Sequence, residues 1–285
     1  MCKDCGCSIT TDGHQHEHTH LDEFGREYTH IHSHEHDYGE HKHESGHHRH
    51  HHDNEHSHDN LHANPQLNDK KTISVITKIL SVNDEQAREN REHFDENGVL
   101  AINLMSSPGS GKTTLLEQII EHSNIPIGVI EGDLETARDA DRIRAKGARA
   151  YQITTGTACH LDAHMVHNGI HHLGLDGLDI VFIENVGNLV CPASYDLGAH
   201  INFVLLSVPE GADKVEKYPV MFRSADLLLI TKCDLLPHFD FDIKEVKEMA
   251  RKLNPKVDIL EVSTKDHESI KKVLHYIEMK KSMRN

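Results

Sequence analysis

The part of this sequence that most constrains its fold is a short loop rich in glycine and serine, placed between an apolar run and a helical pattern. The loop reads SSPGSGKTT at 106–114, after the apolar run 99–105 and before the helical pattern 113–122. A loop that cradles phosphate groups has the pattern G-x-x-x-x-G-K-S/T between a strand and a helix. The glycine-lysine-threonine end fits this pattern, although Ser106 takes the place of the leading glycine. An ordinary glycine-serine turn is the alternative, and the strand-loop-helix context favours a phosphate loop.

The residue types of the loop are those that bind phosphate. Glycines let backbone N–H groups wrap around phosphate oxygens, and the N-terminus of the following helix adds a favourable field. In such loops the lysine reaches the β and γ phosphates and the next hydroxyl holds Mg²⁺. We therefore expect Lys112 and Thr113 to be catalytic, with Thr113 as a Mg²⁺ ligand. The loop residues expected to bind the nucleotide are Gly109, Ser110, Gly111, Lys112, Thr113 and Thr114.

Apolar and helical stretches alternate along the chain after residue 99. Near-continuous apolar runs are typical of parallel strands that helices cover on both faces. We therefore predict an α/β fold of the P-loop NTPase type, with a mostly parallel sheet flanked by helices and preceded by a helix over 71–97. The predicted strands are 99–105, 126–131, 148–153, 179–184, 201–208, 226–231 and 257–262. The predicted helices are 113–122, 136–146, 159–173, 242–253 and 268–280.

Two acidic residues lie at the ends of predicted strands, at the edge where parallel sheets bind ligands. Asp133 ends the sequence EGD at 131–133, and Glu184 ends the run 179–184. Either carboxylate is able to position Mg²⁺ or an attacking water. We expect Asp133 to be catalytic and both residues to bind the nucleotide with its ion. The alternatives are a helix N-cap at Asp133 and a solvated strand end at Glu184.

Two later segments are similar to the base-reading segments of GTPases. The sequence TKCD at 231–234 resembles the N-K-x-D motif, in which the carboxylate accepts two N–H bonds from guanine and the lysine stem lies along the base. Thr231 departs from the usual asparagine. The sequence STK at 263–265 resembles the loop that closes over the guanine, and the order of the segments favours GTP over ATP. A P-loop kinase for a small molecule is the alternative. The residues expected to bind the base are Lys232, Asp234, Ser263, Thr264 and Lys265.

The charge and the histidines of the chain are distributed unevenly. Its 285 residues include 30 Lys or Arg, 46 Asp or Glu and 29 His, with a net charge of −16, and 18 of the histidines fall between His14 and His62. Residues 1–70 have few aliphatic side chains, so they cannot bury enough surface to offset the entropy of ordering. We expect 1–70 to be a disordered metal-binding arm and 71–285 to be a P-loop GTPase domain.

The same composition excludes several classes of function. A net charge of −16 disfavours nucleic acid as the main partner. No apolar run reaches the roughly 18 residues that a membrane helix needs, and the N-terminus has no apolar segment of the kind found in signal peptides. We therefore expect a cytoplasmic protein whose six cysteines are thiols rather than disulfides.

The arm is rich in cysteine and histidine, the residue types that bind divalent metal ions. Cys2, Cys5 and Cys7 lie within seven residues, and Gly6 allows a tight turn around one soft divalent ion. The many histidines that follow can bind divalent ions through neutral imidazoles. An expression tag is the alternative for these histidines, but tags are contiguous whereas these histidines are dispersed among acidic residues.

A further candidate metal site lies in the domain, at Cys159, His160 and Cys191. Two thiolates and an imidazole suit Ni²⁺ or Zn²⁺. If 159–173 is one helix, His164 and His167 lie on the same face as His160 and complete the ligand set. The alternative is that the two cysteines are buried apolar thiols.

Together these motifs resemble those of the HypB family, GTPases that help to insert nickel into nickel-iron hydrogenase. The resemblance covers the first seven residues and the chain from about Lys71 onward. The related urease-accessory GTPase UreG has a Cys-Pro-His motif, whereas Ala193 follows the Cys-Pro pair here, so the sequence favours the hydrogenase branch. The motifs that carry the resemblance are CKDCGC at 2–7, SPGSGKTT at 107–114, EGD at 131–133, CH at 159–160 and ENVGNLVCP at 184–192.

The resemblance implies metal sites, partners and a mechanism. It implies a tight nickel site at the cysteine tip in some members, a nickel or zinc site at Cys159, His160 and Cys191, and a homodimer that depends on nucleotide or metal. The implied partners are a HypA-type nickel chaperone and the hydrogenase large subunit. Our hypothesis is a GTP-hydrolysing nickel metallochaperone with slow turnover, since the sequence identifies no arginine finger. A nickel storage protein with an incidental GTPase, and the urease branch, are the alternatives.

Overall fold

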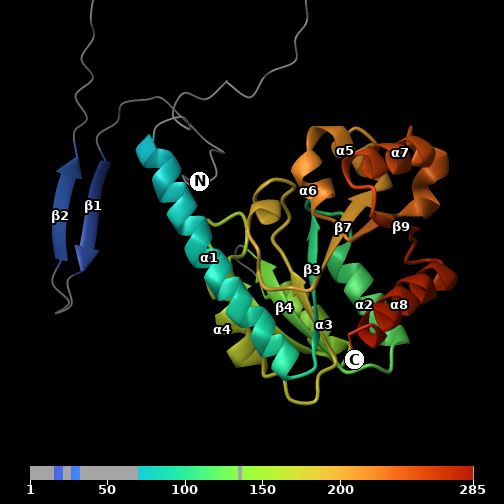
Figure 1. The fold of residues 1–285 in the computed structure, drawn as a ribbon, viewed down its shortest axis with the longest axis horizontal. Coiled ribbons are helices and arrows are strands. Elements are labelled where there is room, and N and C mark those ends of the chain that lie inside the picture. Colours follow the sequence, from blue (N-terminus) through green and yellow to red (C-terminus); the bar gives the residue numbers. More distant parts are fainter. Residues whose placement is uncertain (1–15, 22–26, 33–69, 134–136, 285) are drawn as a thin grey trace, which may run out of the picture.

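A parallel sheet forms the centre of the chain. The computed structural model describes residues 16–21, 27–32, 70–133 and 137–284. Within the last two ranges, seven strands pair in the order β5-β4-β6-β3-β7-β8-β9, all in parallel. Figure 1 labels β3, β4, β7 and β9 of this sheet. Every predicted strand is confirmed. The strands are β3 (Leu100–Ser106), β4 (Ile127–Asp133), β5 (Arg149–Thr154), β6 (Ile180–Glu184), β7 (Ile201–Ser207), β8 (Leu227–Thr231) and β9 (Asp258–Glu261).

The strands are apolar because helices cover both faces of the sheet. Every residue of β3, β6 and β8 is buried. Successive side chains of a strand point to opposite faces, so Leu100 and Ile102 pack in one core with residues of α2 and α8. Ala101 points to the other face, where α1 and α4 lie. Burial of each large apolar side chain contributes about 1.5–3 kcal/mol. The parallel sheet with helices on both faces confirms the predicted α/β class.

The helices follow the predicted pattern, with short additions after β6, β7 and β8. None of the helices in the described ranges is long and apolar enough to cross a membrane. The helices are α1 (Lys70–Glu96), α2 (Lys112–His122), α3 (Arg138–Ala145), α4 (Ala163–Leu173), α5 (Lys214–Lys217), α6 (Pro219–Arg223), α7 (Ile243–Leu253) and α8 (His267–Ser282). The 3₁₀ helices are η3 (Cys191–Ser194), η4 (Val208–Glu210) and η5 (Cys233–His238).

Helix α4 begins later than the sequence predicts. Asp162 is extended, and its carboxylate accepts a hydrogen bond from the backbone N–H of Met165 at 2.7 Å. This N-cap starts the helix at Ala163, so the prediction of a helix over 159–173 is wrong in its first turn. His160 consequently lies outside the helix that carries His164.

Helix α1 confirms the predicted helix over 71–97 and fixes the start of α4. The amide of Asn90 is fully buried, and its Nδ2 donates to the carbonyl of Ala163 at 2.7 Å and to that of Leu197 at 3.1 Å. Asn83 accepts a hydrogen bond from the backbone N–H of Ala163 at 2.9 Å. Two asparagines of α1 therefore hold the first residue of α4.

Part of the predicted arm has regular backbone structure. Strand β1 (His16–Leu21) pairs antiparallel with β2 (Glu27–His32), with His16 opposite His32. We expected no strands there, and the threonine, tyrosine and isoleucine residues of these segments supply the strand preference. Residues 1–15, 22–26 and 33–69 lie outside the described residues, and with them the predicted metal ligands Cys2, Cys5 and Cys7.

Candidate nucleotide and metal site

The loop between β3 and α2 has the backbone of a phosphate-binding loop. Gly109 and Gly111 have positive φ angles of 76° and 101°, a region in which a side chain would be strained. Gly111 is the N-cap residue of α2, so the unpaired N–H groups and positive dipole end of that helix border the loop. A cavity of about 440 Å³ lies against it. Besides loop residues, the cavity is lined by Glu131, Asp133, Arg142, Glu184, Asn185 and Lys232.

Lys112 and Thr113 line this cavity and are buried. The hydroxyl of Thr113 donates to Oε1 of Glu184 at 2.9 Å. Nζ of Lys112 lies 4.0 Å from the same oxygen and donates to the hydroxyl of Ser106 at 3.2 Å. Ser106, which replaces the usual leading glycine, is therefore a hydrogen-bond acceptor for the loop lysine. Ser110 donates to the same hydroxyl.

Two buried carboxylates face the phosphate loop from neighbouring strands. Glu131 of β4 lies opposite Glu184 of β6 in the parallel register, and each is 2% exposed. Burial raises the pKa of both carboxyl groups, and the charge of Glu184 raises the pKa of Glu131 further. Within the described part of the chain, the Oε2 atom of each has no hydrogen-bond partner. Oxygen donors with unused lone pairs beside the hydroxyl of Thr113 fit a hard divalent ion such as Mg²⁺.

The sequence pointed to only part of this oxygen-rich group. Asp133 lines the same cavity as predicted, at the end of β4. Glu131 belongs to the motif EGD, but nothing local distinguishes it from an ordinary strand carboxylate. Its role comes from the pairing of β4 with β6, which places it opposite Glu184.

An arginine that sequence reasoning missed also lines the cavity. Arg142 of α3 donates to the hydroxyl of Thr114 at 3.2 Å and forms ion pairs with Glu117 at 2.6 Å and Asp139 at 2.8 Å. In the sequence it is one charge among several on an amphipathic helix. That no arginine finger serves the phosphates stays a prediction, since Arg142 lines the cavity but is held in ion pairs with Glu117 and Asp139.

The predicted base-reading lysine lies across the phosphate loop. Among the described residues, Lys232 is the one non-glycine residue with a positive φ, 58°. Its Nζ donates to the carbonyl of Gly109 at 2.6 Å. The hydroxyl of Thr231, which replaces the usual asparagine, donates to the carbonyl of Ser110 at 2.8 Å. The two residues thus tie the end of β8 to the phosphate loop.

The other predicted base-binding residues lie together beyond Lys232. The hydroxyl of Ser263 donates to Oδ1 of Asp234 at 2.9 Å, and Lys265 forms an ion pair with Oδ2 at 2.7 Å. These hydrogen bonds, that of Lys265 first, lower the pKa of Asp234. Thr264 and Lys232 line a small neighbouring cavity of about 80 Å³. The four segments of the predicted nucleotide site are therefore adjacent in space.

Cys159, His160 and Cys191 form a compact group of sulfur and nitrogen atoms. Their potential ligand atoms all lie within 4.8 Å of one another. The two Sγ atoms are 2.8 Å apart, and Sγ of Cys159 lies 3.7 Å from Nδ1 of His160. The ring of His160 stacks on Tyr195 with centroids 4.0 Å apart. Two thiols and an imidazole held this closely fit a zinc or nickel ion.

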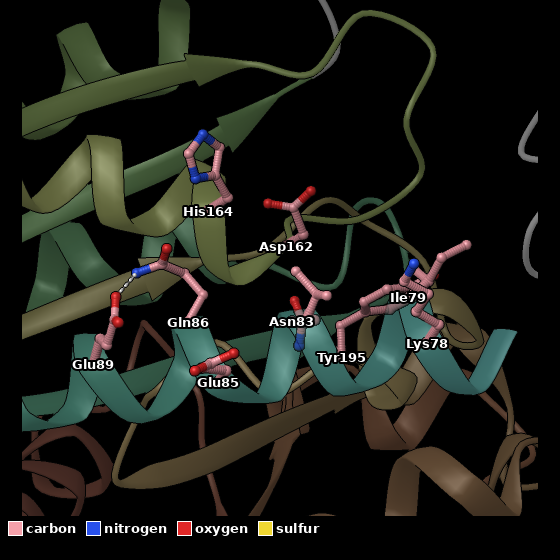
Figure 2. A pocket seen from close by; sticks show the side chains of 10 residues that line it. Lys78, Ile79, Asn83, Glu85, Gln86, Glu89, Asp162, His164 and Tyr195 are labelled. Carbon is pink, nitrogen blue, oxygen red and sulfur yellow. Dashed lines mark hydrogen bonds between the residues drawn. The ribbon is translucent and has the colours of Figure 1, made fainter. Parts of the chain in front are cut away.

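His164 and His167 do not complete this ligand group, contrary to the expectation from the sequence. Among the described residues, the group contains only the two cysteines and His160. The physical reason is the N-cap at Asp162, which separates His160 from α4. Figure 2 shows His164 at a pocket between α1 and the start of α4, where Asp162 and Glu89 also lie. His167 contacts Asn90 and His171 instead.

Residues 185–191 connect the phosphate cavity to the thiol group. The side chain of Asn185, which lines the cavity, accepts a hydrogen bond from the backbone N–H of Leu161 at 3.1 Å, next to His160. The backbone N–H of Asn188 donates to the carbonyl of Ser106 at 2.8 Å, and its side-chain oxygen accepts from the backbone N–H of Cys191 at 3.3 Å. One short segment therefore contacts the phosphate loop and both parts of the thiol group.

A parallel sheet with a phosphate loop between its central strand and the next helix defines a P-loop nucleotide-binding domain. Residues 100–261 match the family model described as CobW/HypB/UreG, nucleotide-binding domain. The chain belongs to this family and, within it, to the HypB proteins.

Relatives match most of the chain. The hydrogenase/urease maturation factor HypB of Helicobacter hepaticus is 52% identical over 226 residues, which are 78% of this chain and 93% of that protein. The hydrogenase maturation factor HypB of Escherichia coli is 45% identical over 219 residues, 76% of this chain and 75% of that protein. The crystal structure of HypB from Helicobacter pylori in complex with nickel is 49% identical, with a TM-score of 0.69 over 70% of this chain and 95% of that one. That of HypB from Archaeoglobus fulgidus is 38% identical, with a TM-score of 0.67 over 72% of this chain and 100% of that one.

Proposed function

We propose that this chain is a GTP-hydrolysing nickel metallochaperone that promotes insertion of nickel into the hydrogenase large subunit. The observation that carries the proposal is the hydrogen-bonded connection between the phosphate cavity and the group Cys159, His160 and Cys191. The names of the relatives and the nickel complex of the Helicobacter pylori HypB support it.

The proposed reaction is attack of a water molecule on the γ-phosphorus of GTP, with cleavage of the bond to the oxygen that bridges the β and γ phosphates. Lys112 donates to the phosphate oxygens in place of Ser106, and Asp133 orients the attacking water. Thr113 and Glu184 would hold Mg²⁺, with Glu131 beside them, and the ion would offset the negative charge of the phosphates. Arg142 at the rim is able to add positive charge if it leaves its ion pairs.

Guanine is the proposed base because of Asp234. Its carboxylate is kept ionised by Lys265 and Ser263 and lies beyond the lysine that crosses the phosphate loop. An ionised carboxylate accepts two N–H bonds from guanine, whereas adenine offers no such pair of donors. Competition of ATP against labelled GTP tests the assignment, and displacement of GTP by equal amounts of ATP would overturn it and favour a kinase.

The proposed coupling runs from the γ-phosphate to the metal through residues 185–191. A shift of Asn185 or Asn188 on hydrolysis moves the backbone of Leu161 or Cys191 and so changes the separation of the metal ligands. The test is the affinity of the domain site for Ni²⁺ in protein loaded with GTP or with GDP, with the mass of the assembly measured on the same samples. Equal affinity and equal mass in the two states would overturn the coupling.

The proposal also includes the oligomeric state of the protein, its partner proteins and its location in the cell. The proposed assembly is a cytoplasmic homodimer that depends on nucleotide or metal, binds Ni²⁺ or Zn²⁺ at the thiol group, and receives nickel from a HypA-type chaperone. Cys2, Cys5 and Cys7 stay a predicted second nickel site. Since some relatives are named for both hydrogenase and urease, maturation of each enzyme should be measured separately.

A storage role is the second candidate, favoured by the 18 histidines between His14 and His62. Under this hypothesis 1–70 acts as a metal reservoir and 71–285 as the working domain. Deletion of 14–62 separates the two roles. Storage predicts a large fall in bound Ni²⁺ per chain with little effect on hydrogenase maturation, whereas Lys112→Ala should have the opposite effect.

A further inference from the structure

Three histidines lie together where α1 packs on α4, apart from the thiol group. His167 and His171 are one helical turn apart on α4, and their Nε2 atoms are 3.0 Å apart. The ring of His93, from α1, has its centroid 5.3 Å from that of His171. His171 is exposed, while His167 and His93 are half-buried. Two imidazole nitrogens thus converge on one point that solvent can reach.

A buried asparagine fixes the protonation of His167. Nδ2 of Asn90 already donates to two backbone carbonyls, and because a carbonyl oxygen only accepts, the amide cannot be flipped. Its Oδ1 therefore faces Nδ1 of His167, at 3.1 Å, and this nitrogen must carry the proton. In the neutral imidazole the lone pair then lies on Nε2, which points toward His171.

This arrangement is the one that metal-binding histidines use. Such a histidine donates its other ring N–H to an oxygen that sets the tautomer and the orientation of the ring. Two nitrogens bound to one divalent ion at about 2.1 Å lie about 3 Å apart when the angle between the bonds is near 90°. The observed separation of 3.0 Å matches this value with both rings in place. Without an ion, the same separation suits a hydrogen bond from His171 to His167.

A pocket lined by carboxylates adjoins the pair at Glu89. Burial, and then the charge of His171, lower the pKa of His167, so its imidazole stays neutral and able to bind an ion, while Glu89 of α1 acts on it with a negative charge. Figure 2 shows Glu89 and Glu85 of α1 along a pocket of about 520 Å³. Asp162 also lines this pocket, and Lys78 is the one lysine or arginine in its lining. Three carboxylates against one ammonium raise the local concentration of divalent ions.

We infer that His167 and His171 form a second metal site of the domain, for a divalent ion such as Ni²⁺ whose square-planar geometry sets bond angles of about 90°, with the ring of His93 beside the pair. Because the histidines of the arm bind ions as well, the test must resolve single residues in the full-length chain. We choose modification of histidines by diethyl pyrocarbonate, read by peptide mass mapping, with and without added Ni²⁺ or Zn²⁺. Since Asn90 occupies Nδ1 of His167, the reactivity of this residue reports Nε2.

The expected result is that the ion slows modification of His167 by about tenfold or more, and that His171→Ala removes this protection. His171 is exposed, so the variant should fold. The matched control is His172→Ala, a neighbouring exposed histidine on the same helix, which should leave the protection of His167 unchanged. His275 on α8 is exposed and should react equally with and without the ion.

Two outcomes would overturn the inference. The first is that His167 stays as reactive as in the metal-free chain when the added ion already protects histidines of the arm. The second is that protection of His167 persists in His171→Ala. Cys191→Ala separates this site from the thiol group, because protection of His167 should survive the loss of that ligand.

Discussion

The two groups of side chains proposed to hold metal ions, one at each end of residues 185–191, differ in the chemistry of their donors. At the phosphate loop, Glu131 and Glu184 offer carboxylate oxygens next to a threonine hydroxyl. At the other end of the segment, Cys159 and Cys191 offer sulfur next to an imidazole. Hard ions such as Mg²⁺ select oxygen, and nickel and zinc accept nitrogen and sulfur. The difference teaches how one domain can offer separate sites to a hard and a softer ion while hydrogen bonds connect the two groups.

The largest predicted effect falls on the phosphate loop and leaves the thiol group unchanged. Lys112→Ala should lower the rate of GTP hydrolysis by about 10²–10³-fold, since one preorganised donor to the developing charge is lost. Binding of Ni²⁺ to the nucleotide-free thiol group should stay unchanged. Phosphate release and equilibrium dialysis measure the two quantities. A similar loss of GTP hydrolysis and of Ni²⁺ binding would mean that the variant is misfolded or that the thiol group depends on the phosphate loop.

The converse variant is Cys191→Ala, in the thiol group. Loss of one ligand should weaken Ni²⁺ binding at the domain site by at least about tenfold, while GTP hydrolysis without added metal changes less than twofold. Cys233→Ala is the matched control, because this third thiol bonds the carbonyl of Ile230 and lies outside the group. Competition with a chromophoric chelator measures the affinity. Equal losses in both variants would contradict the assignment of ligands.

A third prediction concerns the buried carboxyl group of Glu131 at the phosphate loop. Burial raises the folded-state pKa of Glu131 above 4.5. The stability that this carboxyl group contributes, without Mg²⁺ and nucleotide, is therefore lost as the pH rises above 4.5, by up to about 1.4 kcal/mol per pH unit. Glu131→Gln cannot ionise, so its unfolding free energy should fall less between about pH 5 and about pH 8. Denaturant unfolding measures this slope, with the surface variant Glu248→Gln as control. Identical slopes for wild type and Glu131→Gln would contradict it.

The smallest predicted effect concerns residues 185–191, which connect the phosphate cavity to the thiol group. Asn185→Ala removes the acceptor for Leu161 N–H and should reduce the difference in Ni²⁺ affinity between GTP- and GDP-loaded protein by several-fold. Each ligand should still bind when tested alone. Titration of Ni²⁺ into the two loaded forms measures the difference, and Asn254→Ala, which lies near β8 and away from the segment, is the control. An unchanged difference would remove residues 185–191 from the coupling.

A feature could be predicted from the sequence when its residues lie close together along the chain. Lys112 and Thr113 could be predicted because the whole phosphate loop is contiguous. Cys159 and Cys191 could be paired because residues of these types are few outside the arm. The role of Glu131 could not be predicted, because its partner Glu184 is set by the register between two strands that are far apart in sequence. The start of α4 was missed because a cap at Asp162 and a helix beginning at 159 differ by only a few residues.

The positive φ of Lys232 has a consequence for how far this fold can be stabilised. A side chain in the left-handed region costs about 1–2 kcal/mol, which glycine would avoid. Glycine would, however, remove the ammonium group that lies on the carbonyl of Gly109. The position cannot be optimised for both backbone stability and this contact, so the chain keeps a less stable backbone to hold the ammonium group on the phosphate loop.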